Sequence, residues 1–415
     1  MPIKIPTYKN IEAFFKSNFD LQYLHNIDFN KLFEPLKENF EENFINIYDT
    51  EPIYFDFKGQ SFPVFIHNNE TELFTEKGLI SFDVYLNTFL FLSGYLELIS
   101  DKKDIHSRFP YEASLQKKYS FVEIPVVTIY FELIKELALK RGFKLEAKKI
   151  DSPFIFTHDI DQLRSGWYEN IIFYKENFSI KSLIEIPKNL ITKTFGLKDD
   201  YYKGMEEMLQ IDETNNIKAI SFFISNKSEK DADFYLKDKR FESLLKRCKT
   251  KQEIGFHPGY ETFKNQDEFE KQKEDLEKFF EQKITKSRQH FLRYDMAHTP
   301  YIIEQSGIKE DYTLGFAEHY GFRNGISHSF YLFNFKEKKA FTFLTVPLVF
   351  MDVSLTNYTK YSLAERHIEF QKISQFLKNV KISFPTQVSI LFHNSVFTEV
   401  KYKGLKAFYK KLTQI

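Results

Sequence analysis

The chain has 415 residues, which is long for one ordinary domain, and its 58 basic and 58 acidic residues balance to a formal net charge of zero. The length predicts two domains or one enlarged domain with a substantial core. No basic stripe with interleaved aromatic residues is present, which argues against nucleic acid as the main partner. Cys248 is the only cysteine, so an intrachain disulfide is excluded.

The N-terminal and apolar segments carry no recognisable export or membrane signal. Residues Met1–Pro6 lack the apolar core of a secretory signal peptide. The most hydrophobic segment, Phe82–Ile99, is interrupted by polar residues and a glycine, which favours a buried helix over a membrane span. We therefore expect a cytoplasmic protein without a membrane span, whose oligomeric state the sequence does not indicate.

The first part of the chain, residues 1–148, is predicted to form a smaller α/β accessory domain. Short strands are expected at Ile53–Phe57 and Pro63–Ile66, and apolar helices at Phe82–Ile99 and Pro125–Arg141.

From Ser152 onward, apolar strands alternate with amphipathic helices. The predicted strands are Phe154–Thr157, Ala219–Ile224, Glu253–Phe256, Lys286–Phe291, Tyr312–Phe316, Val346–Met351 and Val388–Phe392. The predicted helices are Asp233–Arg247, Asp267–Lys283, Thr299–Gln305 and Leu363–Val380. This alternation predicts an α/β fold with a mainly parallel sheet, either open or closed as a barrel. Ligands then bind at the carboxyl ends of the strands.

Two carboxylates follow the first of these strands, in Thr157-His158-Asp159-Ile160-Asp161. On an extended backbone Asp159 and Asp161 share one face, while His158 points the other way. Carboxylates so close repel unless one binds a cation and the other accepts a proton. The pair indicates one metal ligand and one general base; a strand-ending turn capped by Asp is the alternative.

Glu253 and His257 lie four positions apart and share a face of the third predicted strand. Carboxylate and imidazole are both good ligands for a divalent transition metal. Pro258 fixes the following turn, and Gly259 lets the backbone approach a ligand closely. The alternative is an ordinary His-Pro turn beside an exposed glutamate.

His393 comes at the end of the apolar last strand. This position favours a catalytic acid or base over a satisfied core histidine. Arg288 and Arg293 lie on and after the fourth strand, where an arginine can orient a carboxylate or hold an anionic substrate. A surface salt bridge is the alternative for either arginine.

These four segments, in this order, resemble the motif series of the polysaccharide deacetylases, also called the NodB-homology or carbohydrate esterase 4 superfamily. Thr157–Asp161 resembles the first motif, and Glu253–Pro258 resembles the second, normally His-x-x-x-His-Pro. Arg288–Arg293 sits where the third supplies an arginine, and Leu391-Phe392-His393 matches the final Leu-x-His. The resemblance covers about Ser152 to the C-terminus and implies a distorted (β/α) barrel catalytic domain over residues 152–415.

The resemblance implies a metal-dependent hydrolase that removes an N-acetyl, or less readily an O-acetyl, group from a sugar or cell-envelope glycan precursor. Asp159 would be the general base, His393 the general acid, and Arg288 a further catalytic residue. The tetrahedral oxyanion would be stabilised by the metal and by a backbone N–H near Gly259–Tyr260.

The same resemblance implies a divalent metal held by Asp161 and His257, with zinc expected first and cobalt, nickel or manganese as alternatives. Glu253 stands in the place of the first metal-binding histidine. Two carboxylates and one histidine would make the site neutral, so that the metal would polarise a carbonyl less strongly. Alternatively, Glu253 does not reach the metal. Ile160 separates the two aspartates, which many members have adjacent.

The substrate-binding candidates are Tyr260, Arg293, Arg323 and Asp352, with the two arginines suited to an anionic part of the substrate. A cytoplasmic location would favour a nucleotide-linked or lipid-linked sugar.

Three further segments resemble an uncharacterised subgroup of predicted deacetylases with an N-terminal accessory domain: Asp104–Phe109, Gly321–Gly325 and Pro347–Leu355. In the first of them, Asp104, His106 and Arg108 lie either in a loop over the active site or in a surface turn.

Two other functions remain open from the sequence. One is a catalytically silent relative that binds a glycan or a partner protein, which the imperfect second motif suggests. The other is a metal-dependent amidohydrolase that acts on a non-sugar amide, since related folds also support that chemistry.

Overall fold

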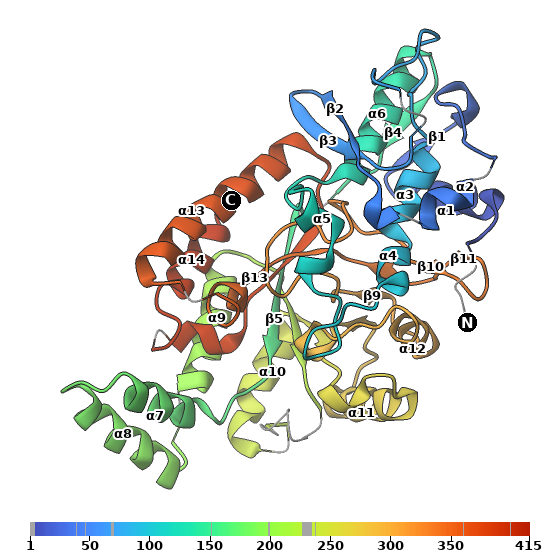
Figure 1. Ribbon diagram of the computed structural model, residues 1–415. Helices are drawn as coiled ribbons and strands as arrows, with labels where there is room; N and C mark the ends of the chain where they lie inside the picture. Colours follow the sequence, from blue (N-terminus) through green and yellow to red (C-terminus); the bar gives the residue numbers. More distant parts are fainter. Residues whose placement is uncertain are drawn as a thin grey trace.

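The computed structural model describes residues 5–38, 40–45, 47–67, 70–150, 152–197, 200–225, 235–236, 238–359, 361–398 and 400–415. Within these ranges, eight parallel strands form the central sheet (Figure 1). In spatial order they are β12 (Leu344–Thr345), β9 (Glu310–Asp311), β8 (Lys286–Ser287), β7 (Glu253–Phe256), β6 (Ile220–Phe223), β5 (Phe154–Ile160), β14 (Val388–Leu391) and β13 (Leu348–Met351). The predicted α/β class with a parallel sheet is therefore confirmed.

The two edge strands of this sheet, β12 and β13, follow one another in the chain and are separated only by Val346 and Pro347. Val346 N–H donates to the carbonyl of Asp311 after β9 (2.8 Å), and Ser389 N–H of β14 donates to the carbonyl of Pro347 (2.7 Å). One continuous segment therefore borders both edges, so the sheet curls round upon itself. This arrangement is consistent with the predicted distorted barrel.

Two of the predicted strands are wrong in their extent. The fourth ends at Ser287 rather than Phe291, because Phe291 and Leu292 have positive φ angles of 59° and 52°, which extended backbone does not allow. The fifth comprises Glu310–Asp311, not Tyr312–Phe316. The other predicted strands of this part overlap the observed ones.

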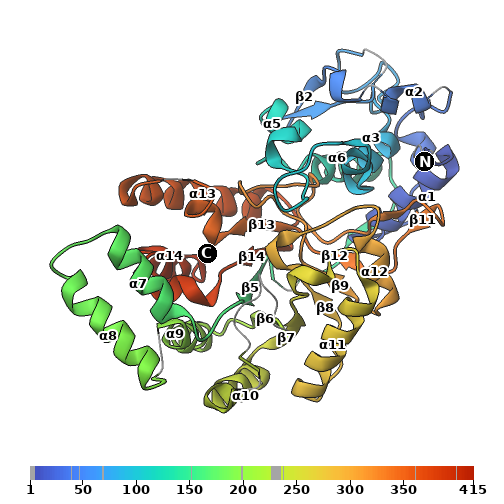
Figure 2. The same cartoon turned by 60° about the horizontal axis from the view of Figure 1, so that its bottom comes forward.

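Helices surround the sheet, as Figure 2 shows. They are α9 (Asp200–Thr214), α10 (Glu242–Lys251), α11 (Gln266–Phe280), α12 (Thr299–Gln305), α13 (Leu363–Ser383) and α14 (Leu405–Leu412). The helix predicted at Asp233–Arg247 begins only at Glu242, after a 3-10 turn at Lys239–Phe241, and residues 233, 234 and 237 of the prediction lie outside the described residues. Two further helices, α7 (Gly166–Glu176) and α8 (Ser182–Thr194), form a hairpin that the sequence analysis did not predict.

The N-terminal part is mainly helical. Its elements are α1 (Tyr8–Phe19), β1 (Tyr23–His25), α2 (Phe40–Ile45), β2 (Ile53–Phe57), β3 (Gln60–Val64), α3 (Val84–Leu92), α4 (Tyr95–Ile99), α5 (Leu115–Lys118), α6 (Val126–Lys140) and β4 (Leu145–Ala147). The pairs β1–β4 and β2–β3 are antiparallel, as is the short pair β10 (Phe333–Asn334) and β11 (Lys339–Ala340) of the later part. The helix predicted at Phe82–Ile99 is divided at Gly94, whose φ is +80°. A Cβ at this position would lie only 2.8 Å from Met296 Sδ, so a larger residue would clash there.

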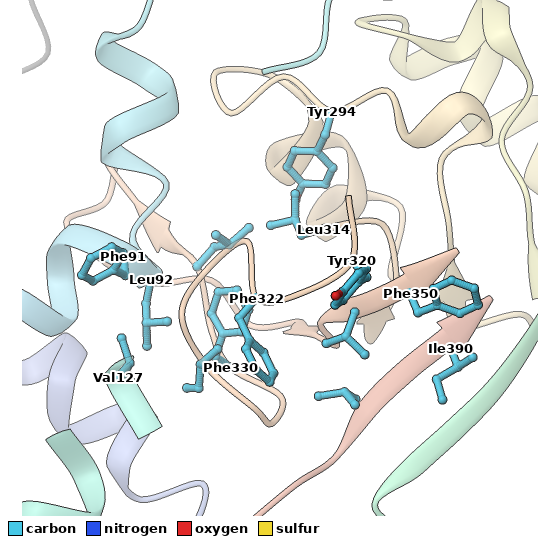
Figure 3. Packing of buried hydrophobic residues seen from close by; sticks show 14 of the residues in the cluster. Phe91, Leu92, Val127, Tyr294, Leu314, Tyr320, Phe322, Phe330, Phe350 and Ile390 are labelled. Atoms are coloured by element: carbon cyan, nitrogen blue, oxygen red, sulfur yellow. The ribbon is translucent and has the colours of Figure 1, made fainter. Parts of the chain in front are cut away.

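One hydrophobic core joins the N-terminal part to the rest of the chain. In Figure 3, Phe91, Leu92 and Val127 of the N-terminal part lie beside Phe322 and Phe330. The segment Gly321–Gly325 supplies the main-chain contacts: Phe322 N–H donates to the Val122 carbonyl (2.7 Å), and Val127 N–H donates to the Gly325 carbonyl (2.8 Å). This segment, which the sequence analysis singled out, therefore docks the two parts together.

Within the described ranges, no helix is both long enough and apolar enough to cross a membrane.

Candidate functional site

Five ionisable side chains converge at the carboxyl ends of the barrel strands. Asp159 and Asp161 come from the end of β5, His257 from the residue after β7, His290 from the turn after β8, and His393 from the turn after β14. They line one pocket of about 290 Å³. The structure thus brings together four of the predicted site residues and adds His290. His158 points away from this group, as expected, and packs 3.1 Å from the buried carboxylate of Asp212.

Asp161, His257 and His290 form the candidate metal site, with ligand atoms that all lie within 4.8 Å of one another. His257 Nε2 is 3.2 Å from Asp161 Oδ1, and His290 Nε2 is 3.7 Å from Asp161 Oδ2. Two ligand atoms of one tetrahedral zinc ion lie roughly 3.4 Å apart, so these separations suit a shared divalent ion.

The hydrogen-bond partners of His257 support the same interpretation. Its Nδ1 lies 2.5 Å from the Arg288 carbonyl oxygen, so Nδ1 carries the proton and Nε2 presents a lone pair toward Asp161. Within the described part of the chain, His257 Nε2 and Asp161 Oδ1 are buried without a hydrogen-bond partner. Buried polar atoms are normally paired, and a bound metal ion would satisfy both.

Electrostatics prepare Asp161 for this role. Burial by itself would raise the pKa of Asp161, but the neighbouring imidazoles of His290, His257 and His393 hold it well below its ordinary value. The carboxylate is therefore ionised, as a metal ligand must be.

Glu253, predicted as a metal ligand, does not reach this site. Its side chain is 56% exposed and forms an ion pair with Lys286 at 2.8 Å. Glu253 begins β7 and His257 follows its end. Although residues four apart on a strand share a face, they lie roughly 13 Å apart along it, too far to bind one ion. His290 provides the second imidazole instead.

His290 was missed because the strand before it was predicted to continue to Phe291, which would have placed His290 inside a strand. The observed strand ends four residues before Phe291, at Ser287. A strand end near Ser287 would have revealed His290 as one more polar residue at the ligand-binding edge. The two left-handed residues that follow, Phe291 and Leu292, are a strained arrangement of the kind that concentrates at functional sites.

Arg288 fills the interior of the barrel beneath Asp159. It is fully buried, and its Nη1 donates to Asp159 Oδ1 (3.0 Å) and to Thr157 Oγ1 (2.8 Å). The guanidinium lies over the Phe222 ring at 4.8 Å. Gly255 makes room for that ring, since a Cβ there would lie 2.3 Å from it. Arg288 therefore fixes one carboxylate oxygen of Asp159 while Oδ2 faces His257 Nε2 at 3.7 Å.

Asp352 orients His393. Its carboxylate is fully buried and accepts hydrogen bonds from the His393 backbone N–H and from Nδ1, both at 2.7 Å. Burial would lower the pKa of the His393 imidazole, but the charge of Asp352, with Asp161 and Asp159 adding to it, raises that pKa to about 10. The predicted role of Asp352 in binding substrate directly is therefore corrected to that of a residue that positions His393.

The N-terminal part of the chain contributes Arg108 to the pocket. Asp104 holds this guanidinium by an ion pair at 2.7 Å. Arg108 Nη1 donates to the Phe291 carbonyl (2.7 Å) and to the Tyr358 hydroxyl (3.0 Å). Of the two alternatives for this segment, the structure favours the loop over the pocket, and Arg108 secures the turn that presents His290.

The remaining substrate-binding candidates do not line the pocket. Arg293 donates to the Tyr260 carbonyl (2.9 Å), and its guanidinium stacks 3.8 Å over the Tyr260 ring. Arg323 is buried and pairs with Glu97 at 2.6 Å, which joins the two parts of the chain. The polar groups of Arg293 and Arg323 are engaged away from the pocket, and the Tyr260 hydroxyl lies 3.5 Å from His106 Nδ1. The substrate-binding role predicted for these three side chains is therefore corrected to a structural one.

Other polar and aromatic side chains that the sequence analysis did not identify complete the wall of the pocket. They include Gln162, Glu169, Tyr201, Asn357, Tyr358, Ser395, Lys401 and Tyr402. They come mostly from α7, the start of α9 and loops. The rule that ligands bind at the carboxyl ends of parallel strands does not identify such residues, so only the folded structure shows that they converge.

Comparisons with known proteins give the following similarities. A family profile described as "Family of unknown function (DUF7033)" matches residues 1–143. No curated protein sequence is significantly similar to the chain. A crystal structure from Mycobacterium smegmatis, provisionally described as a polysaccharide deacetylase, has a TM-score of 0.41 at 12% sequence identity, covering 65% of this chain and 87% of its own.

Two crystal structures of mutants of a CE4-family pseudoenzyme, one of them with restored enzymatic activity, have TM-scores of 0.25 at 12% identity, covering 68% of this chain and 77% of theirs.

Proposed function

We propose that the chain is a metal-dependent hydrolase that removes an N-acetyl, or less readily an O-acetyl, group from a sugar or cell-envelope glycan precursor. The observation that carries the proposal is the convergence of three units in one pocket. These are the Asp161–His257–His290 cluster, the Asp159–Arg288 pair and the His393–Asp352 pair. Together they offer metal ligands, a base and an acid, the groups that hydrolysis of an amide requires.

Asp161, His257 and His290 would hold a divalent ion. One carboxylate and two imidazoles suit zinc first, with cobalt, nickel or manganese as alternatives. The ion would supply positive charge that polarises a carbonyl group and lowers the pKa of water. Because His290 replaces Glu253 as the third ligand, the site keeps a net positive charge when a divalent ion is bound.

Asp159 would remove a proton from the attacking water. Arg288 fixes Oδ1 from below, so Oδ2 stays directed toward the pocket beside His257. A carboxylate whose orientation is fixed in this way acts as a general base without first reorganising. Such a contribution is about a hundred- to ten-thousandfold in rate.

His393 would donate a proton to the departing amine, which is otherwise a poor leaving group. Asp352 accepts a hydrogen bond from Nδ1, so Nε2, which lies 3.7 Å from Asp161 Oδ2, presents its proton to the pocket. The raised pKa of His393 keeps this proton in place at neutral pH.

The pocket suits a small polar substrate. Its volume of about 290 Å³ lies near the lower end for small-molecule sites, which favours a single acetylated sugar unit. Tyr201, Tyr358 and Tyr402 provide aromatic surface for such a ring, and Lys401 provides a positive charge at the wall. That the substrate is a cytoplasmic, nucleotide-linked or lipid-linked sugar remains part of the proposal.

The test is release of acetate from a panel of acetylated amino sugars by protein loaded with zinc, cobalt, nickel or manganese. A set of small cyclic amides is assayed in parallel. Turnover of a sugar that chelation abolishes is expected. Turnover of the cyclic amides alone would assign the site to a non-sugar amidohydrolase. If the protein binds no stoichiometric metal, the chain would be a catalytically silent binding protein.

A further inference from the structure

The hairpin of α7 and α8 carries a face of apolar side chains that the described part of the chain leaves open to solvent. Figures 1 and 2 both show the two helices projecting from the body beside α9. Ile184 is 67% exposed on α8, and Phe195, just after it, is 73% exposed. Phe178 and Ile180, in the turn between the helices, are 68% and 85% exposed. Few soluble proteins expose so many large apolar side chains on one element without a partner.

The helix α8 buries polar residues and exposes apolar ones, which is the reverse of an ordinary surface helix. Its buried residues are Ser182 and Asn189, and Asn189 Oδ1 accepts a hydrogen bond from Asn170 of α7 (3.2 Å). Its apolar residues Leu183, Ile184, Leu190 and Ile191 are exposed. Because 183, 184, 190 and 191 follow the helical repeat, they form one stripe away from the protein.

The helix α11 shows the ordinary arrangement in the same molecule. It buries Phe269, Leu276 and Phe280 and presents most of its charged residues to solvent. The stripe on α8 is therefore a property of this hairpin rather than of the helices in general.

Basic residues border the apolar stripe. Lys175, Lys181, Lys188 and Lys193 are exposed, and among the described residues of the hairpin Glu176 is the only exposed acid. Lys193 Nζ of α8 lies 4.7 Å from the centre of the Trp167 ring of α7, so a cation and an aromatic residue are paired between the two helices of the hairpin. An apolar stripe edged by lysines and aromatic residues is the pattern of a helix that lies in an anionic lipid surface.

We propose that the α7–α8 hairpin docks on an anionic lipid bilayer, with Leu183, Ile184 and Ile191 entering the headgroup region. A second copy of the chain fits this face less well, since a two-fold contact would set the same lysines against one another. A lipid surface that carries negative charge complements both the stripe and its border.

Docking in this way would hold the pocket near the bilayer, because α7 also supplies Glu169 to the pocket wall. The site would then meet a lipid-linked acetylated sugar rather than a freely diffusing one. This last step, unlike the docking itself, rests on the proposed function.

The test uses the full chain and vesicles of phosphatidylglycerol and phosphatidylcholine in equal parts, without added metal or sugar. Trp167 is the only tryptophan of the chain, so its fluorescence reports on binding at the hairpin, and co-sedimentation provides a second measurement. The double variant Ile184→Asp, Ile191→Asp is compared with Ile382→Asp, which changes an equally apolar residue that is 83% exposed on α13.

The expected result is that the hairpin variant binds at least about tenfold more weakly than the wild-type chain, since charged groups replace two apolar side chains that the bilayer would otherwise bury. The Ile382→Asp control should bind like the wild type, and vesicles of phosphatidylcholine alone should bind less. Equal binding of wild type and hairpin variant would overturn the proposal. So would self-association through the hairpin without vesicle binding. Acetate release from a soluble substrate is independent of both results, so failure of docking and failure of the hydrolase proposal are distinguishable.

Discussion

The two ends of the sheet around β7 carry similar side chains in opposite electrostatic situations. At the amino end, Glu253 and Glu310 both pair with Lys286, at 2.8 and 3.1 Å, so each of these three charged groups has a partner. At the carboxyl end, Asp161 and His257 bring buried polar atoms together without a hydrogen bond in the described structure. A saturated cluster stabilises a surface, whereas an unsatisfied one is prepared for a ligand.

This difference distinguishes charged residues with a structural role from those that can bind a ligand, which their positions in the sequence alone do not do. Glu253 and His257 lie on one strand and share a face, yet only His257 enters the pocket. Distance along the strand decides which residue has a function, as the general rule for parallel sheets predicts.

The largest effect is expected from removal of a metal ligand at the carboxyl end. Asp161→Asn and His257→Ala should each weaken zinc binding by about a hundredfold or more, because even residues that only support a ligand contribute about ten- to a hundredfold. Competition with a chromogenic chelator measures the affinity. Wild-type affinity in both variants would mean that the metal site lies elsewhere.

Next come the two residues assigned to proton transfer. Asp159→Asn and His393→Ala should each lower kcat by about a hundred- to ten-thousandfold while metal binding remains. A coupled assay for acetate, with metal content measured on the same samples, separates loss of catalysis from loss of the metal. Near-wild-type turnover in either variant would contradict its assigned role.

A smaller effect is expected from Asp352→Asn, which keeps the shape of the residue that positions His393. Loss of the carboxylate charge should lower kcat by about ten- to a hundredfold, since a misoriented imidazole transfers its proton less efficiently. KM and metal content should stay unchanged. A rise in KM at constant kcat would instead restore the direct substrate contact first predicted for Asp352.

Arg108 tests whether the N-terminal part supports the site. Arg108→Ala removes the donor to the Phe291 carbonyl and should weaken metal binding by roughly tenfold, since the turn that presents His290 is then less fixed. Leu24→Ala serves as a control on the same part, because Leu24 is exposed and lies on β1. If both variants bind the metal equally well, the two parts are not coupled through this contact.

The smallest effect is expected at the amino end. Glu253→Gln removes one exposed ion pair and should change the free energy of unfolding by no more than about 0.5 kcal/mol, with unchanged metal affinity. Urea denaturation and the same chelator competition measure both quantities. A large loss of metal affinity here would abolish the distinction between the two ends.

The sequence predicted the parts of the site that follow from regular strands. Asp159, Asp161, His257 and His393 lie together in the structure, because each comes at the end of an apolar strand and such ends converge in a parallel sheet. Glu253 was wrongly predicted as a metal ligand, because it shares a face of β7 with His257 but lies at the opposite end of the strand. His290 was missed because the left-handed residues Phe291 and Leu292 end the extended segment earlier than the apolar pattern indicates.

The rest of the molecule depended on contacts that a single sequence does not reveal. The helix α8 was not predicted although its apolar residues follow the helical repeat, and the sequence does not reveal that this stripe faces solvent. The contacts of Arg108 and Arg323 join segments that lie 183 and 226 positions apart in the chain. Such pairings emerge only when the whole fold is in place.

X-ray absorption spectroscopy of the zinc-loaded chain tests whether His290 is a metal ligand, because it counts the imidazole ligands of the ion. We expect two imidazoles and a carboxylate in the wild type, one imidazole in His290→Ala, and an unchanged spectrum in Glu253→Gln. A wild-type site with a single imidazole, or one altered by Glu253→Gln and not by His290→Ala, would contradict this assignment.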